Sequence, residues 1–247
     1  MKILLTNDDG WDAPGLKVLQ TSAANFGEIW IVAPAGPMSG ISHQVTFERP
    51  LTLTPTAERA YSLDGTPADC VRIGTTQLGI SFDWVLSGIN NGGNLGADIF
   101  VSGTVAAARE ATLRGVRSIA LSQHRNKFKS EFDWTRTGWM TEQVLRRLLV
   151  PGTHWEPRTV VNVNLPDRFH SSASDQDSAT NLSQHQFLQQ LSLLECVQDG
   201  HPLPADFLID DEGRYLYCSK YSERPRMVGR DIAVCFGGAV AITLLRF

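Results

Sequence analysis

The chain has 247 residues, of which 42% are hydrophobic and 19% charged, and this suits one large α/β domain or one domain with an appendage. The net charge is −4 and the lysines and arginines are scattered, which argues against a nucleic acid polymer as partner. No stretch approaches the ~20 apolar residues of a membrane span. The first apolar run is too short for a signal peptide, so we expect a soluble, cytoplasmic protein without membrane contact.

The cysteine pattern excludes two further classes. Four cysteines stand far apart and form no CxxC pair: Cys70, Cys196, Cys218 and Cys235. This spacing argues against structural zinc and against a disulfide framework. We expect all four to be reduced, buried residues.

The first ten residues combine a strand pattern with two adjacent carboxylates. The apolar run 3–5 is followed by Asn7, Asp8, Asp9 and Gly10. Such a run is typical of a buried strand in a parallel sheet, and ligands bind beyond the carboxyl ends of such strands. A divalent cation would relieve the repulsion between Asp8 and Asp9. The same residues also suit a plain turn or helix cap, and this stretch alone leaves both readings open.

The next elements form a strand–helix–strand unit. Pro14 suits the start of a helix that ends at Gly27, and residues 29–33 are apolar. Such a unit predicts two parallel strands. The loop 36–40 should therefore leave the sheet at the edge that carries Asp8 and Asp9, with Ser39 near them.

The rest of the chain continues the alternation. Residues 45–63 predict short, partly exposed β-segments or a hairpin. In order, we then expect a helix at 68–78, a strand at 84–87, a glycine-rich loop at 88–96, a helix at 105–114, a strand at 118–122, a helix at 134–149, a strand at 160–165, an exposed polar excursion at 170–186, a helix at 187–196 and strands at 215–219 and 239–245. The fold class is thus α/β with a Rossmann-like, mostly parallel sheet. We assign 1–125 to the core and 126–247 to its completion and extension.

Oxygen-bearing side chains gather on three loops of the expected sheet edge. They are Asp8 and Asp9, Ser39, and Asn90 with Asn91 or Asn94. Carboxylate, hydroxyl and amide oxygens suit a hard cation such as magnesium or manganese. Taken singly, a serine in such a loop also fits a turn, and an asparagine also fits left-handed backbone.

A phosphate site is the natural companion of such a cation. An alanine-rich helix is preceded by Ser102, Gly103 and Thr104. These three residues supply free backbone N–H groups and hydroxyls, which suit a phosphate. The alternative is that one of these residues simply caps the helix. A phosphate beside a metal is coherent, because the cation neutralises charge on the phosphoryl oxygens.

Several other chemistries lack their motifs. The chain has no GxGxxG after its first strand, no GxxxxGK[ST], no HExxH and no GxSxG. The six histidines show no metal-ligand spacing. His43 follows the Ser39 loop, so an approach to the site stays open, but we favour a position at the surface or at the edge of the core.

These residues together resemble the SurE family of survival-protein nucleotidases. The motifs that carry the resemblance are NDDG (7–10), VAP (32–34), SG (39–40), GTPADCV (65–71), SGIN (87–90), NLG (94–96) and SGTVAAARE (102–110). They cover the first half of the chain, and 231–245 resembles the family's closing helix and strand. Val101 and Ala111 depart from the family pattern, where an aromatic residue and a glycine are usual.

The resemblance implies a metal-dependent phosphomonoesterase acting on nucleoside 5′- or 3′-monophosphates, with possible action on short polyphosphate. It implies a three-layer αβα sandwich with a swapped C-terminal element, as a homodimer or homotetramer. It also implies one Mg²⁺ or Mn²⁺ per subunit. The implied metal ligands are Asp8, Asp9, Ser39 and Asn90, and the implied phosphate-binding residues are Gly40, Asn94, Ser102, Gly103 and Thr104.

We interpret the chemistry as metal-assisted hydrolysis, with Asp8 or Asp9 available to orient the attacking water. An aspartyl-phosphate route is disfavoured, because the two carboxylates are adjacent rather than two residues apart. Two other classes stay open from the sequence. One is a non-catalytic nucleotide-binding regulator, and the other is a metal-dependent sugar-nucleotide transferase.

Overall fold

A computed structural model describes residues 1–125, 133–150, 155–167 and 183–247. Most of the expected polar excursion, residues 170–182, lies outside these ranges. Within them, the dominant feature is a nine-stranded sheet with the order β3-β4-β2-β1-β5-β6-β7-β11-β8. The strands are β1 (Lys2–Thr6), β2 (Glu28–Pro34), β3 (Leu53–Ala57), β4 (Ala60–Leu63), β5 (Trp84–Asn91), β6 (Arg117–Gln123), β7 (Thr159–Leu165), β8 (Leu193–Cys196) and β11 (Val240–Arg246).

The sheet is mostly parallel. The run from β4 through β7 is parallel throughout, whereas β3 is antiparallel to β4 and β11 is antiparallel to β7. β1 shows the burial that accompanies such a sheet. Its side chains alternate between the two faces, and all of them from Ile3 to Thr6 are buried. A strand buried on both faces must be covered by helices on both sides.

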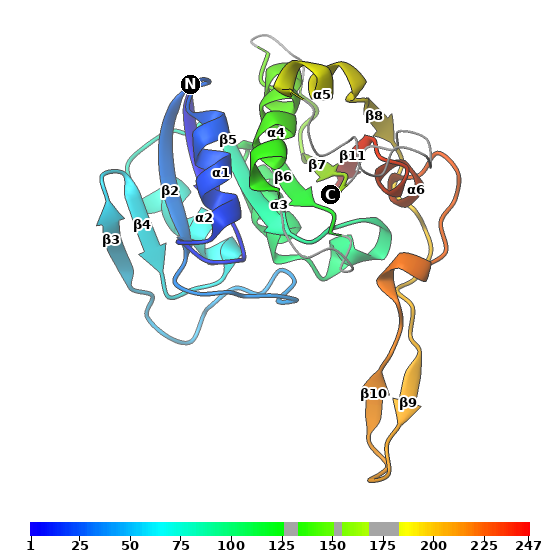
Figure 1. The fold of residues 1–247 in the computed structure, drawn as a ribbon. Coiled ribbons are helices and arrows are strands. Elements are labelled where there is room, and N and C mark those ends of the chain that lie inside the picture. The colour runs from blue at the N-terminus through cyan, green and yellow to red at the C-terminus, as the bar shows by residue number, and fades with distance from the viewer. Residues whose placement is uncertain (126–132, 151–154, 168–182) are drawn as a thin grey trace.

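Helices supply that cover (Figure 1). On one face, α1 (Pro14–Ala23) and α4 (Trp134–Leu148) share one hydrophobic cluster with Ile3 and Leu5 of β1. On the other face, α2 (Pro67–Gln77) and α3 (Gly103–Leu113) share a second cluster with Leu4 of β1. The predicted α/β class with three layers is therefore confirmed.

Two sequence predictions within the sheet were wrong. The loop expected from residue 88 onward begins later, because β5 continues through Gly88 to Asn91 across a register shift against β6. The glycines of the stretch 88–96 favoured a loop in the sequence, so the continuation of the strand was not predicted. The helix expected at 187–196 is split into α5 (Gln184–Gln190) and the strand β8. Parallel pairing of β8 with β11 overrides the helical spacing of its apolar residues.

The C-terminal part ends as expected, with α6 (Asp231–Phe236) followed by β11. Before it, β9 (Phe207–Ile209) and β10 (Tyr215–Tyr217) form an antiparallel hairpin that extends away from the body of the molecule (Figure 1). The sequence predicted β10 and missed β9. No helix among the described residues has the length and apolar character needed to cross a membrane.

The cysteines are all free thiols, as predicted. Cys70 and Cys235 are buried and Cys196 is half-buried, but Cys218 is exposed. The expectation of burial was wrong for Cys218, because this residue directly follows β10 at the base of the projecting hairpin.

Candidate functional site

The parallel strands β1, β2 and β5 deliver three loops to one edge of the sheet, as the strand–helix–strand pattern predicted. Two hydrogen bonds donated by backbone N–H groups join these loops. The Met38 N–H donates to the Asp8 carbonyl oxygen at 2.7 Å, and the Asn91 N–H donates to Asp9 Oδ2 at 3.1 Å. The Ser39 loop and the end of β5 therefore both contact the acidic pair.

Asp8 lies against the N-terminus of α3. Its Oδ1 accepts a hydrogen bond of 2.5 Å from Thr104 Oγ1. A Cβ atom added at Gly103 would lie 2.9 Å from the Asp8 Cβ, so this contact requires glycine. The positive end of the helix dipole thus faces a carboxylate, which is a favourable arrangement.

Burial nevertheless dominates the titration of this carboxyl group. Asp8 is 6% exposed, and its burial raises its pKa to about 6, with repulsion from Asp9 adding to the rise and the Thr104 hydrogen bonds opposing it. Burial also raises the pKa of Asp9. Among the described residues, neither carboxylate forms an ion pair with a lysine, arginine or histidine. Two anions in this setting favour a bound cation.

This titration predicts how stability varies with pH in metal-free protein. Asp8 has a higher pKa in the folded chain than its usual 3.8, so the folded state binds more protons between these values. The contribution of Asp8 to the free energy of unfolding should fall as pH rises from about 4 to 7, by about 3 kcal/mol. Urea unfolding in chelator tests this. Asp8→Asn should lack that component, and identical pH profiles for parent and variant would contradict it.

The remaining expected metal ligands lie on the same edge. The Asn90 Nδ2 group donates to the Gly92 carbonyl at 2.8 Å, and Oδ1 of Asn90 accepts no hydrogen bond from the described residues. Ser39 is exposed and directly follows Met38, whose backbone contacts Asp8. Gly40 has a positive φ of 70°. The structure thus brings these residues to the acidic pair without a direct contact between their side chains and the carboxylates.

Besides Gly40, four residues were expected to bind phosphate; two of them contact Asp8, and the other two form hydrogen bonds elsewhere. Gly103 and Thr104 contact Asp8. Ser102 Oγ instead accepts a hydrogen bond from the Val105 N–H at 3.1 Å, which is the capping role left open by the sequence. The Asn94 Nδ2 group is buried and donates to Ser122 Oγ at 2.8 Å.

Two buried asparagines of β7 were missed by sequence reasoning. The side-chain amides of Asn162 and Asn164 both donate to the Asn94 carbonyl oxygen, at 2.9 and 3.0 Å. The Asn94 N–H donates to Asn164 Oδ1 at 2.8 Å. The two asparagines therefore hold the loop that follows Asn90. Polar residues at alternate positions of an otherwise apolar strand were the available signal.

The oxygen atoms of Asp8, Asp9, Ser39 and Asn90 are donors that fit a hard cation, although only two of these side chains are carboxylates. No group of three or more histidine, cysteine, aspartate or glutamate side chains in the described ranges could hold a metal. An ion here would use the two carboxylates together with neutral oxygens and water, as magnesium commonly does.

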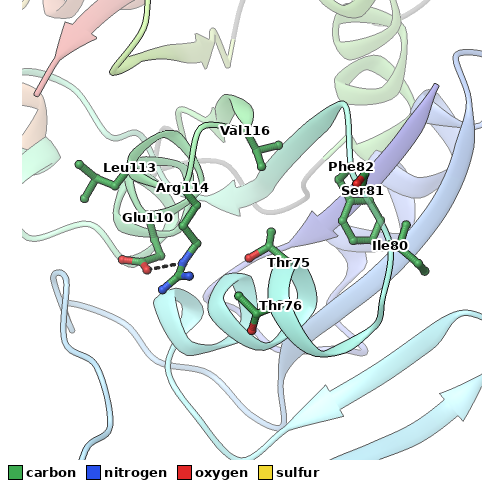
Figure 2. Close-up of a pocket in the computed structure, with 9 residues that line it drawn as sticks. All are labelled: Thr75, Thr76, Ile80, Ser81, Phe82, Glu110, Leu113, Arg114 and Val116. Carbon is green, nitrogen blue, oxygen red and sulfur yellow. Dashed lines mark hydrogen bonds and ion pairs between the residues drawn. The ribbon is translucent and has the colours of Figure 1, made fainter.

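A separate cavity of about 670 Å³ lies between the C-terminal ends of α2 and α3 (Figure 2). Asp8 lies at the opposite end of α3. The charged groups of the cavity pair with each other, since Arg114 Nε donates to Glu110 Oε1 at 2.7 Å. The hydroxyls of Thr75 and Thr76 donate to carbonyl oxygens of their own helix. We therefore place the functional site at the sheet edge and not in this cavity.

Comparison with known proteins identifies the family of the chain. The sequence profile of the survival protein SurE family matches residues 3–189. This chain belongs to the SurE family. It is 42% identical to a putative 5′-nucleotidase of Nostoc sp. over the full length of both chains. It is 36% identical to a 5′-nucleotidase SurE of Paramagnetospirillum magneticum, over all of this chain and 90% of that one.

The SurE fold is also shared. The crystal structure of the SurE protein from Aquifex aeolicus superposes with a TM-score of 0.81 at 28% identity, covering 100% of this chain and 93% of that one. The resemblance predicted from the motifs is therefore confirmed, including in the second half, where the sequence motifs are weaker.

Proposed function

We propose that this chain is a metal-dependent 5′-nucleotidase that hydrolyses nucleoside 5′-monophosphates to nucleoside and phosphate. The observation that carries the proposal is the acidic pair Asp8 and Asp9 at the N-terminus of α3, with no cationic side chain paired to it among the described residues. The names of the relatives, which are 5′-nucleotidases, support this substrate class. Activity on 3′-monophosphates and short polyphosphate extends the same proposal.

In this proposal, Asp8, Asp9, Ser39 and Asn90 hold one Mg²⁺ or Mn²⁺ per chain. When bound, the ion withdraws charge from the phosphoryl group and makes water more acidic. Asp8 is held by Thr104 and serves as the fixed ligand. Asp9 is less buried, so it is the carboxylate that can also orient the attacking water.

The phosphoryl group is bound at the start of α3. The first N–H groups of a helix lack partners within the helix and point toward an anion. Gly103 supplies such an N–H beside Asp8, and the flexible backbone of Gly40 lets the Ser39 loop approach the phosphate closely. Ser102 fixes this helix start through its cap, and Asn94 fixes the neighbouring loop.

Release of inorganic phosphate from AMP tests the proposal. We expect release with Mg²⁺ or Mn²⁺, none in excess chelator, and recovery when the ion is restored. A nucleotide-binding regulator would bind AMP without release, and a transferase would require an acceptor, so either result would overturn the proposal. A panel of 5′- and 3′-monophosphates and short polyphosphates then defines the range.

We also propose that two or more copies of the chain associate through the β9–β10 hairpin. All six strand residues of the hairpin are more than half exposed, although each is a large apolar or aromatic residue: Phe207, Leu208, Ile209, Tyr215, Leu216 and Tyr217. A patch of this kind on a projecting ribbon is typical of an interaction surface. This interpretation agrees with the expected homodimer or homotetramer. Exchange of a C-terminal element between copies stays a prediction.

A double substitution tests the hairpin. Leu208 and Leu216 face each other across the ribbon, so Leu208→Asp with Leu216→Asp adds two charges to the patch. We expect the mass measured by light scattering to fall from that of an oligomer to that of a smaller species. Leu113→Asp, at an exposed leucine of α3, serves as the control. An unchanged mass in the double variant would contradict the assignment.

We also propose that the two parts of the chain have different roles. Every proposed site residue lies within 1–125. Residues 126–247 contribute β7, β8 and β11 to the same sheet and carry the hairpin. The cytoplasmic location stays a prediction.

A further inference from the structure

A half-buried charged network joins the segment that follows the Ser39 loop to α3. His43 Nε2 lies 3.0 Å from Glu110 Oε2, and their side chains are 23% and 12% exposed. Arg109 Nε donates to His43 Nδ1 at 2.8 Å. Because Nδ1 accepts this hydrogen bond, the imidazole proton is on Nε2 and is donated to Glu110.

Glu110 is itself fixed from a second side. Its other oxygen, Oε1, accepts a hydrogen bond from Arg114 Nε at 2.7 Å, and Arg72 Nε lies 3.9 Å from the same oxygen. The hydrogen bond from His43 is the largest cause of the lowered pKa of Glu110. The carboxylate is therefore ionised at neutral pH and forms a charge-assisted anchor for His43.

The residue before His43 completes the attachment. The Ser42 N–H donates to the Val101 carbonyl at 3.1 Å, and Ser42 Oγ donates to the Phe100 carbonyl at 2.8 Å. Ser42 adopts a positive φ of 55°, a conformation that non-glycine residues keep only where their surroundings impose it. The segment 42–43, which directly follows the Ser39 loop, is thus fixed both to the turn before α3 and to the body of α3.

We propose that His43 is a positioning residue, which holds Ser39 and Gly40 in place relative to Asp8 through Glu110. The inference rests on the proposed function, which assigns Ser39 to the metal and Gly40 to the phosphate. His43 forms its side-chain hydrogen bonds with Glu110 and Arg109, and none of them goes to a proposed metal ligand. Its effect arises because α3 carries Glu110 in its second half and contacts Asp8 at its first residue, Gly103. The same helix therefore fixes the positions of both the Ser39 loop and the Asp8 loop.

Three variants test the proposal. His43→Ala should weaken Mn²⁺ binding, measured by electron paramagnetic resonance, by about tenfold or more, the usual effect of losing an outer-shell partner. It should also speed hydrogen exchange at the Ser42 amide. His43→Gln keeps a side-chain N–H for Glu110 and a carbonyl for Arg109, so both readouts should stay within about threefold of the parent. His185→Ala, at an exposed residue of α5, is the matched control and should change neither.

The outcomes separate cleanly. Parental Mn²⁺ affinity and parental Ser42 exchange in His43→Ala would overturn the proposal, and so would equal damage in His43→Gln, since that would indicate packing rather than hydrogen bonding. If His43→Ala fails to fold, Glu110→Ala removes the anchor from the other side and should give the same losses. If the parent neither binds Mn²⁺ nor releases phosphate, the proposed function fails, while the exchange at Ser42 still tests the attachment itself.

Discussion

Asp9→Asn is expected to lower phosphate release from AMP by roughly 10²-fold or more, a loss typical of removing one electrostatic stabiliser of a transition state. The substitution removes one negative charge and almost no volume. The Asn91 N–H, which donates to Asp9 Oδ2 at 3.1 Å, can donate to the amide oxygen instead. Burial raises the pKa of Asp9, so the ionised form is not what stabilises the fold. We therefore expect stability to be preserved while turnover is lost.

Two measurements establish this result. Turnover of AMP is measured with saturating Mg²⁺ or Mn²⁺, and urea unfolding is measured in parallel. Asp12→Asn, an exposed aspartate three residues later, is the matched control and should keep parental turnover. Parental turnover in Asp9→Asn would show that the ligand assignment is wrong.

Gly15→Ala is expected to lower the free energy of unfolding by about 3 kcal/mol, at the upper end of the usual cost of overpacking. A Cβ at this position would lie 1.9 Å from the Ile89 carbonyl oxygen and 3.0 Å from Cη2 of Trp134. Backbone cannot yield as a flexible side chain does, so α1 must move away from β5. Ile89 precedes Asn90, and the shift should therefore reduce activity as well.

Gly138→Ala, in contrast, is expected to stabilise the fold. Gly138 lies inside α4, and an added Cβ would meet its nearest neighbour, Val18 Cγ1, at an ordinary 3.5 Å. Replacing a helical glycine by alanine without a clash should raise the free energy of unfolding by roughly 0.5–1 kcal/mol. Urea denaturation of both variants measures the contrast. Equal stabilities for Gly15→Ala and the parent would contradict the close contact between α1 and β5.

The elements that sequence reasoning predicted well are those specified by local pattern. The apolar run of β1, the proline at the start of α1 and the alanine-rich α3 each carry their own signal. The parallel direction of β1 and β2 follows from the helix that connects them. The position of the acidic pair at the sheet edge followed from these local features alone.

The features that were missed depend on distant partners. β8 is a strand because β11 lies beside it, and no local signal distinguishes it from the end of a helix. The contact of Thr104 with Asp8 joins residues 96 positions apart. Likewise, the hold of Asn162 and Asn164 on Asn94 exists only once β7 has joined the sheet. Sequence motifs indicated which residues gather at the edge, but not which of them hold the others in place.

The most direct test of the metal centre is a crystal of the parent chain grown with Mn²⁺, measured at a wavelength where manganese scatters anomalously. We predict one anomalous peak per chain, within ~2.2 Å of carboxylate oxygens of both Asp8 and Asp9, with Asn90 and Ser39 completing the protein ligands. A peak elsewhere in the molecule, or none at saturating Mn²⁺, would contradict the account.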